Sequence, residues 1–301
     1  MGTPDFAVPC IKALHDAGHE LCAVYTQPDK PKGRGYTLTP PPVKVFALQH
    51  EIPVFQPEKL KNNAEVIEHL RAVSPDVIVV VAYGKILPKD ILELPKYGCI
   101  NVHASLLPKY RGAAPIQWSI INGESVTGVT TMCMDVGLDT GDMLLSEEIT
   151  ISENENAEQL HDELSSIGAE LIVKTLKELE NGTLTPKKQD DSLSCYAPML
   201  DRTLSEIDWN DTAKNIHNKV RGLYPWPSAY SEAGGKRIKI LKTQITAGKG
   251  NPGDVLSLTP FTVACGNGAV EIIELQPEGK KRMSASDFIR GNRTEITHLG
   301  K

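Results

Sequence analysis

An uninterrupted apolar run, Val77–Ala82, constrains the fold more strongly than any other stretch of the sequence. Its six residues match the length of a strand, and a strand that is apolar at every position must be buried on both faces. Such strands occur in parallel sheets that helices cover on both sides. No part of the sequence approaches the ~20 apolar residues that a membrane-spanning helix needs, so we expect no membrane partner. The run therefore predicts an α/β fold.

Helical and strand-like patterns alternate around this run over the first 180 residues. The expected helices are Pro9–Ala17, which ends at Gly18, and Val43–His50, Lys59–Val73, Ala114–Ile121 and Asn156–Leu179. The expected strands, besides the apolar run, are Glu20–Tyr25, Pro53–Phe55, Cys99–His103 and Gly128–Met134. This alternation is typical of a mostly parallel sheet with right-handed crossovers.

The pattern changes after Pro186. Short strand-like segments separated by Gly, Pro and Asn are typical of a small antiparallel barrel. These segments are Arg237–Leu241, Gly253–Leu258, Thr262–Cys265 and Val270–Leu275. We therefore expect an N-terminal domain over residues 1–185, a linker over 186–199 and a C-terminal domain over 200–301.

The sequence begins with Met1–Asp5, a Gly-Thr-Pro turn that leads directly into the first helix. In alternating domains a turn of this kind follows a strand. We therefore expect the sheet to lack its first strand. The neighbouring strands, Glu20–Tyr25 and Val77–Ala82, would then face an unpaired edge inside the core, which would reduce stability.

The spacing of the cysteines and the first residues indicate the cellular compartment in which the protein works. Six cysteines are scattered without CxxC or paired spacing, which is typical of free thiols in a reducing compartment. No charged and then apolar leader opens the sequence. We therefore expect a cytoplasmic protein.

The charge of the chain is unevenly distributed. Residues 1–198 carry 17 Lys and Arg against 27 Asp and Glu, a net charge of −10, whereas residues 199–301 carry 15 against 11, a net charge of +4. A basic C-terminal part indicates an anionic partner that contacts it. Ordinary surface variation is an equally good explanation on charge alone.

A carboxamide and an imidazole occupy the end of an apolar strand. Asn101 and His103 point to the same side of the sheet, because side chains alternate along a strand. The carboxyl ends of parallel strands are where α/β sheets carry their sites. Two donors aimed at one oxygen would stabilise a developing oxyanion. The alternative is a polar pair that satisfies backbone groups at the end of the strand.

Two loops follow that could complete a site. Ser105–Pro108 comes directly after the strand, and its backbone amides could hold a flat polar ligand; the alternative is a plain connection. Asp135–Asp142 is a glycine-containing turn with three carboxylates, one of which could orient His103. Their spacing is not that of a calcium loop, so we predict no metal. The sequence has no GxSxG elbow, P-loop or dinucleotide fingerprint.

Four of these blocks together resemble the signature of the 10-formyltetrahydrofolate-dependent formyltransferases. The blocks are Asn101–Pro108, Arg111–Ile116, Gly128–Thr130 and Asp135–Asp142. The resemblance implies that Asn101, His103 and Asp139 form a catalytic trio and that Ser105, Leu106, Leu107 and Pro108 line the folate site. It also implies a Rossmann-like N-terminal domain, an OB-like β-barrel at the C-terminus, and 10-formyltetrahydrofolate as the formyl donor.

Further blocks resemble the branch of this family that acts on initiator methionyl-tRNA. They are Thr26–Gly35, Val79–Gly84, Pro225–Pro227 and Gly279–Ala285. The resemblance implies tRNA contacts from the Thr26–Pro42 segment, an expected loop, and from the basic C-terminal domain. The candidate contacts are Lys30, Lys32, Arg34, Lys280, Lys281 and Arg282.

Three alternatives remain beside this interpretation. The basic loop could be a solvated flexible connection. The nearest rival activity is formylation of a sugar-nucleotide amine with the same donor. A non-enzymatic RNA-binding module is a rival of another class. We expect the protein to act as a monomer.

Overall fold

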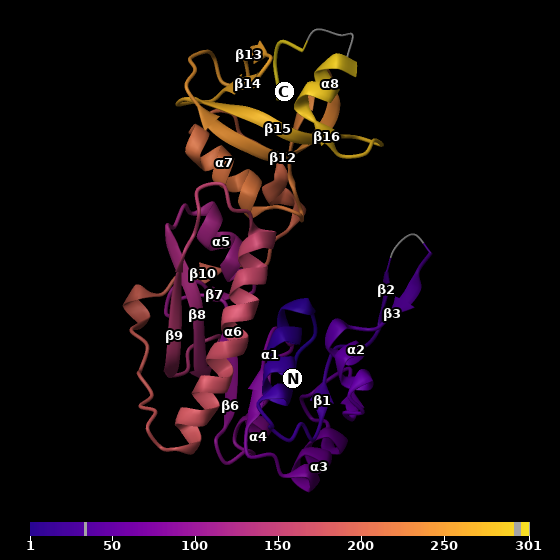
Figure 1. Cartoon of the computed structure of the whole chain (residues 1–301), viewed down its shortest axis with the longest axis vertical. Helices are drawn as coiled ribbons and strands as arrows, with labels where there is room; N and C mark the ends of the chain where they lie inside the picture. Colours follow the sequence, from indigo (N-terminus) through magenta and orange to yellow (C-terminus); the bar gives the residue numbers. More distant parts are fainter. Residues whose placement is uncertain (33–34, 292–295, 301) are drawn as a thin grey trace. The chain divides into compact units, whose positions relative to one another are not determined.

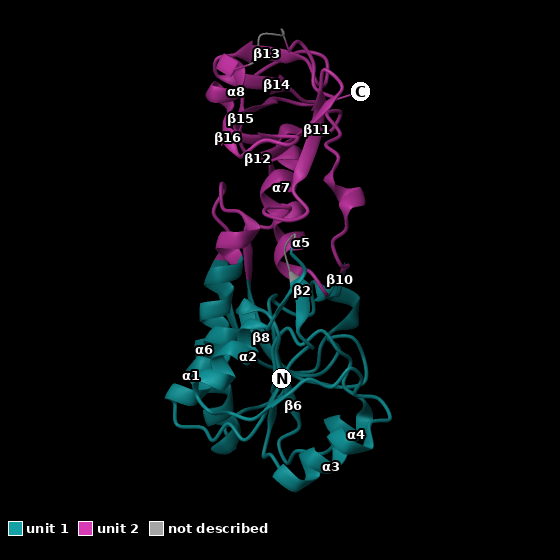
Figure 2. Ribbon diagram, turned by 90° about the vertical axis from the view of Figure 1, so that its right-hand side faces the viewer, with its two compact units in different colours: residues 1–112, 128–149, 161–196 teal, residues 113–127, 150–160, 197–301 magenta. Residues whose placement is uncertain are grey.

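The computed structural model describes residues 1–32, 35–291 and 296–300. The chain divides into two compact units, which Figure 2 colours separately. Unit 1 comprises residues 1–112, 128–149 and 161–196, and unit 2 comprises 113–127, 150–160 and 197–301. In the described residues, no helix has both the length and the apolar character that crossing a membrane requires.

Unit 1 contains a mixed sheet in the order β5-β6-β8-β9 and a two-stranded sheet of β1 and β4 (Figure 1). The strands are β1 (Val24–Tyr25), β4 (Val54–Phe55), β5 (Ile78–Val80), β6 (Cys99–His103), β8 (Val126–Cys133) and β9 (Met143–Thr150). The predicted parallel pairing is confirmed for β1 with β4 and for β5 with β6. However, β8 runs antiparallel to β6. The sheet is therefore less uniformly parallel than the alternation predicted.

Met1 and Gly2 lie between β1 and β5. The Met1 amine donates to Val79 O at 2.6 Å, and Gly2 N donates to Tyr25 O at 3.0 Å. Beside this contact lies a cavity of about 340 Å³, whose lining includes Ala23 and Val77 next to the two strands. The first two residues thus occupy only one end of the space between the two strands.

Helices cover the sheets of unit 1. They are α1 (Val8–Asp16), α2 (Pro42–Gln49), α3 (Ala64–Val73), α4 (Lys89–Leu92) and the long α6 (Ala157–Glu180). The first helix stops where predicted, before Gly18, whose φ of 84° suits glycine. Asn63 caps α3 by accepting from Val66 N at 3.2 Å. On α6, a Cβ at Gly168 would lie 2.9 Å from the side chain of Val102, so this glycine lets the helix approach β6 closely.

The segment Thr26–Pro42, predicted as a loop, contains a hairpin. Strand β2 (Lys30–Lys32) pairs antiparallel with β3 (Thr37–Thr39). The exposed fraction of Leu38 is 66%, so burial does not drive this pairing. In its described residues the hairpin is defined by backbone pairing and not by buried apolar side chains, so apolar periodicity does not predict it.

Unit 2 is built on an antiparallel sheet in the order β11-β12-β15-β14-β13, with β16 paired to β15. The strands are β11 (Ala229–Ala233), β12 (Lys236–Thr246), β13 (Val255–Leu258), β14 (Phe261–Ala264), β15 (Ala269–Pro277) and β16 (Met283–Ser284). The helices of this unit include α5 (Pro115–Ile121), α7 (Ala213–Gly222) and α8 (Ala285–Gly291).

The predicted OB-like barrel is not confirmed, because no described strand ladder closes this sheet. The last described residues bond to both sides of the sheet. Beside β13, Val255 N donates to Thr297 O at 2.9 Å and Leu299 N donates to Gly253 O at 2.8 Å, around an isolated antiparallel bridge of Asp254 with His298. At β11, Gly300 N donates to Glu232 O at 2.9 Å. The core of the unit is buried behind them and includes Trp209, Ile240 and Phe261.

Candidate active site

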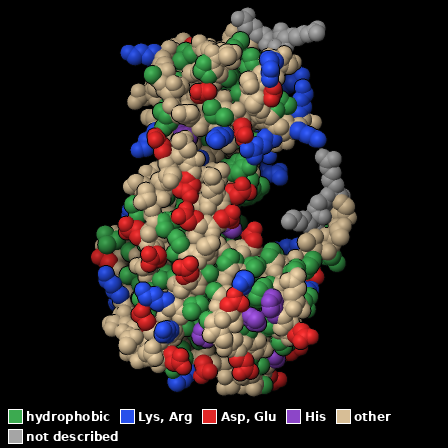
Figure 3. Space-filling view, viewed as in Figure 1, with side chains coloured by type: hydrophobic (Ala, Val, Ile, Leu, Met, Phe, Trp, Pro, Cys, Tyr) green, Lys and Arg blue, Asp and Glu red, His purple; other side chains and the backbone are tan. Residues whose placement is uncertain are grey.

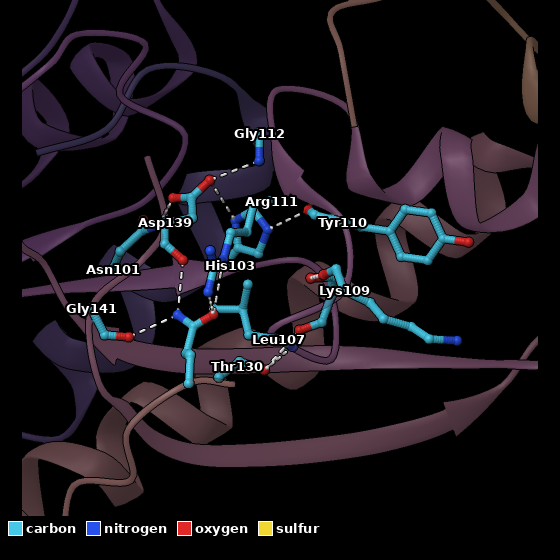
Figure 4. Close-up of polar contacts among 12 residues, drawn as sticks. Asn101, His103, Leu107, Lys109, Tyr110, Arg111, Gly112, Thr130, Asp139 and Gly141 are labelled. Carbon is cyan, nitrogen blue, oxygen red and sulfur yellow. Dashed lines mark hydrogen bonds and ion pairs between the residues drawn. The ribbon is translucent and has the colours of Figure 1, made fainter. Parts of the chain in front are cut away.

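Strand β6 delivers Asn101 and His103 to one site, as their spacing predicted (Figure 4). His103 is buried, with 6% of its surface exposed. Its Nε2 lies 2.9 Å from the carbonyl oxygen of Tyr110. Because a carbonyl oxygen only accepts, Nε2 carries the proton in this arrangement. The other ring nitrogen, Nδ1, is therefore the one available for proton exchange.

The carboxylate of Asp139 lies against both of these side chains (Figure 4). Its Oδ2 is 3.7 Å from His103 Nδ1, and its Oδ1 is 3.5 Å from Asn101 Nδ2. Oδ2 also accepts a shorter bond, 2.9 Å, from Gly112 N. Asp139 has a positive φ of 53°, which asparagine and aspartate tolerate better than most residues. The three residues predicted to form a trio thus meet at one point.

The predicted folate loop, Ser105–Pro108, is held against β8 by Thr130. The Thr130 hydroxyl donates to Ser105 O at 2.7 Å and accepts from Leu107 N at 3.2 Å. The Ser105 hydroxyl in turn donates to Lys109 O at 2.7 Å. Leu106 and Pro108 remain partly exposed. The loop therefore has a fixed backbone and could present an apolar surface to a ligand.

Two residues that sequence reasoning missed, Arg111 and Gln189, brace the Asp139 turn. Gln189 Nε2 donates to Asp139 O at 2.8 Å and to Gly141 O at 2.7 Å. Its Oε1 accepts from Arg111 Nε at 3.0 Å and from Nη2 at 2.8 Å. Arg111 Nη2 also pairs with Asp191 at 2.7 Å. Arg111 lies in a block that the resemblance used, but Gln189 lies in the predicted linker, where no pattern marks it.

The candidate tRNA contacts of unit 1 are described only in part. Lys30 is exposed at the start of β2, and Lys32 ends the same strand. Arg34 lies outside the described residues. The structure therefore shows an accessible cation at Lys30.

The candidate tRNA contacts of unit 2 are exposed. Lys280 and Lys281 are free of side-chain partners among the described contacts, whereas Arg282 pairs with Glu274 and donates to the Tyr224 hydroxyl at 2.8 Å. Figure 3 shows Lys and Arg side chains gathered on the displayed face of unit 2. The neutralised Arg282 is thus a weaker candidate than the two lysines.

Strand β12 adds a basic strip that sequence reasoning missed. Its exposed cations are Lys236, Arg237, Lys239 and Lys242. The Arg237 guanidinium lies 3.9 Å from the ring centre of Tyr230, which gives an exposed cation–aromatic pair. The alternation of basic with buried apolar residues in Arg237–Ile240 was the available signal, since it marks one face of this part of the strand as basic.

The described residues contain no group of three or more His, Cys, Asp or Glu side chains that could hold a metal ion.

Comparisons with known proteins agree with this arrangement. Residues 1–176 match the family described as formyl transferase, and residues 199–293 match the formyl transferase C-terminal domain. A methionyl-tRNA formyltransferase of Citrifermentans bemidjiense is 56% identical over 97% of this chain and 92% of the relative. One from Geobacter metallireducens is 54% identical over 98% of this chain and 95% of the relative.

A solved structure shares the fold. It is an N-formyltransferase from Helicobacter canadensis in complex with folinic acid and dTDP-3-aminofucose, with a TM-score of 0.68 and 23% identity. The similarity covers 92% of this chain and 97% of that one. With both family domains matched and relatives more than 50% identical along almost the whole length, the chain belongs to the formyl transferase family, among the methionyl-tRNA formyltransferases.

Proposed function

We propose that Asn101, His103 and Asp139 transfer the formyl group of 10-formyltetrahydrofolate to the amino group of methionine on initiator tRNA. The observation that carries this proposal is the meeting of one carboxylate with an imidazole and a carboxamide at the end of β6. Acyl transfer to an amine requires a donor for the oxyanion and an acceptor for the amine proton. These three side chains supply both.

The first step is attack of the neutral amine on the formyl carbon. A free α-amino group titrates near pH ~7.7–8.0, so an appreciable fraction is neutral at physiological pH. The formyl oxygen becomes an oxyanion as the new C–N bond forms. Asn101 Nδ2 is the donor for it, because its contact with Asp139 is long, 3.5 Å, and is readily exchanged for a charged acceptor.

The second step moves one proton. The attacking nitrogen passes a proton to the His103–Asp139 pair, whose Nδ1 and Oδ2 are 3.7 Å apart. The same proton then goes to the folate nitrogen as its bond to the formyl carbon breaks. The products are a formamide and tetrahydrofolate, so atoms and charges balance. The folate would lie along Ser105–Pro108.

Three alanine variants test these roles. Asn101→Ala, His103→Ala and Asp139→Ala should each lower kcat by about 10²–10³, while folate binding is kept. Asn181→Ala, an exposed residue after α6, is the matched control. Formyl transfer is measured with methionylated initiator tRNA, and a sugar-amine nucleotide serves as the rival acceptor. Wild-type turnover in a folded variant would remove that residue from the mechanism, and preference for the sugar nucleotide would favour the rival activity.

We propose that unit 2 holds the tRNA through phosphate contacts. The net charge of +4 on residues 199–301 and the exposed cations of β12 and of Lys280–Lys281 support this. Reversing the charge of Lys280, Lys281 and Arg282 should flatten the salt dependence of tRNA binding, by roughly 0.7–0.9 in log–log slope for each phosphate that is no longer neutralised. An unchanged slope in the triple variant would place the tRNA elsewhere.

We further propose that the protein works in the cytoplasm and as a monomer. Size-exclusion chromatography with light scattering tests the second point, for which a mass of 32.8 kDa is expected.

A further inference from the structure

We infer that Gln189 is a positioning residue for the proposed reaction: its side-chain amide fixes the Asp139 turn so that the Asp139 carboxylate faces His103. This inference rests on the proposed role of Asp139. Gln189 is buried, with 6% of its surface exposed, although it lies in the segment that joins the two family domains. A buried amide has four hydrogen-bonding positions, and the structure shows a specific partner for each.

The nitrogen of the amide holds the backbone of the turn. Its two hydrogens go to two carbonyl oxygens, Asp139 O at 2.8 Å and Gly141 O at 2.7 Å. Asp139 adopts a positive φ, a conformation that costs energy and persists only where its surroundings enforce it. The two bonds from Gln189 supply that enforcement on the backbone side of Asp139.

The oxygen of the amide is held by Arg111, through bonds of 3.0 and 2.8 Å. The next residue, Gly112, donates to the Asp139 carboxylate at 2.9 Å. The backbone and the carboxylate of Asp139 are therefore tied to the same dipeptide, one through Gln189 and the other directly (Figure 4). This ring of hydrogen bonds leaves the carboxylate little freedom to leave His103.

Only an amide fits this position. A glutamate would place an acceptor against two carbonyl oxygens, although it would still pair with Arg111. A methionine of similar length would offer no hydrogen bond to either side. Both substitutions remove the two hydrogen bonds to the turn. The glutamate keeps the contact with Arg111, and the methionine removes it as well.

The test compares Gln189→Met and Gln189→Glu with Gln244→Met, a matched control at an exposed position of β12. We expect both Gln189 variants to lower kcat by about 10²-fold, as a misplacement near 1 Å does, with KM for both substrates changed by less than about 2-fold. The control should keep the wild-type kcat. A loss confined to KM, or wild-type kcat in either Gln189 variant, would overturn the inference.

A double-variant cycle separates positioning from general destabilisation. If Gln189 acts through Asp139, then Gln189→Met should change kcat little when it is added to Asp139→Ala. A merely structural role would lower kcat again in that background, by a similar factor. Additive losses would therefore refute the inference. If Asp139→Ala alone keeps wild-type turnover, it is the proposed function of Asp139 that fails, and the two failures are thus distinguishable.

Melting temperatures are recorded for every variant. A variant that is unfolded at the assay temperature is replaced by Gln189→Asn, which keeps the amide but is too short to reach both the turn and Arg111. Wild-type kcat in folded Gln189→Asn would also overturn the inference.

Discussion

An apolar extension joined to the amine of Met1 should enter the space between β1 and β5 and raise the free energy of unfolding. The perturbation is an extension of four residues at the N-terminal side of Met1, which consists mainly of Ile and Val. They would continue the path of Met1 and Gly2, which already bond to Val79 and Tyr25 on the two flanking strands. They would also fill a cavity of about 340 Å³.

The magnitude follows from three terms. Burying a Val or Ile side chain gives about 1.5–3 kcal/mol, and ordering its backbone costs about 1–2 kcal/mol. The backbone hydrogen bonds to the flanking strands add about 0.5–1.5 kcal/mol each. Four residues should therefore give several kcal/mol. In a domain of this size, each kcal/mol raises the melting temperature by about 2–4 °C, so a rise of roughly 10 °C is expected.

The buried amine provides a second, pH-dependent signature. Burial lowers the pKa of the Met1 amine from 8.0 to about 6. Between these values the unfolded chain binds a proton that the folded chain does not, so stability falls as the pH drops from about 8 to 6 and levels off below. This difference in pKa corresponds to roughly 2.7 kcal/mol in the free energy of unfolding. The extension converts the amine into a peptide group, so this dependence should disappear.

The assay is thermal unfolding of both chains at about pH 8.5 and about pH 6, with mass spectrometry to confirm the first residue. A Ser- and Gly-containing extension of equal length is the control, because it can bond to the strands without filling the cavity. Equal melting temperatures for the original chain and the chain with the apolar extension, at both pH values, would refute the reasoning.

Two further predictions concern packing and the thiols. Gly128→Ala should lower the melting temperature, at a cost of about 1–3 kcal/mol, because its Cβ would lie 2.1 Å from the backbone oxygen of Glu147. Gly291→Ala, which has open space around it, is the matched control, and equal melting of the two variants would contradict the argument. Burial raises the pKa of the Cys10 thiol to about 12, so iodoacetamide should label exposed Cys22 long before Cys10 at neutral pH, as followed by peptide mass spectrometry.

Each contact of the site was predictable to the extent that its residues lie close together in the sequence. Asn101 and His103 were placed together by alternation along one strand, which is a local property. Asp139 lies 38 residues after Asn101, and only the resemblance selected it among the three carboxylates of its turn. Gln189 bonds to Arg111 over 78 residues of chain and to the Asp139 turn over 50. No periodicity encodes such a contact, because a single buried amide leaves no repeating pattern.

The fold divides along a similar line. Strands buried on both faces, such as β5 and β6, were predicted from apolar runs. The β2–β3 hairpin was not, since Lys30, Pro31, Thr37 and Leu38 are exposed and the two strands pair through backbone bonds. The barrel was expected from the short strands separated by Gly, Pro and Asn. Closure of a barrel depends on which strand edges pair, and that pattern carries no information on edge pairing.

The turn that carries Asp139 shows why this site should lose activity more readily than stability. Its two large apolar side chains, Val136 and Leu138, are 76% and 54% exposed, so burial does little to hold the turn. Polar interactions hold it instead, among them the bonds from Gly112 to the carboxylate of Asp139 and from Gln189 to its backbone. A hydrogen bond of this kind contributes about 0.5–1.5 kcal/mol to stability, which is small beside a total of roughly 5–15 kcal/mol. The same bond holds the carboxylate toward His103, and proton transfer requires its partners to stay within hydrogen-bond reach. Substitutions around this turn should therefore separate kcat from melting temperature.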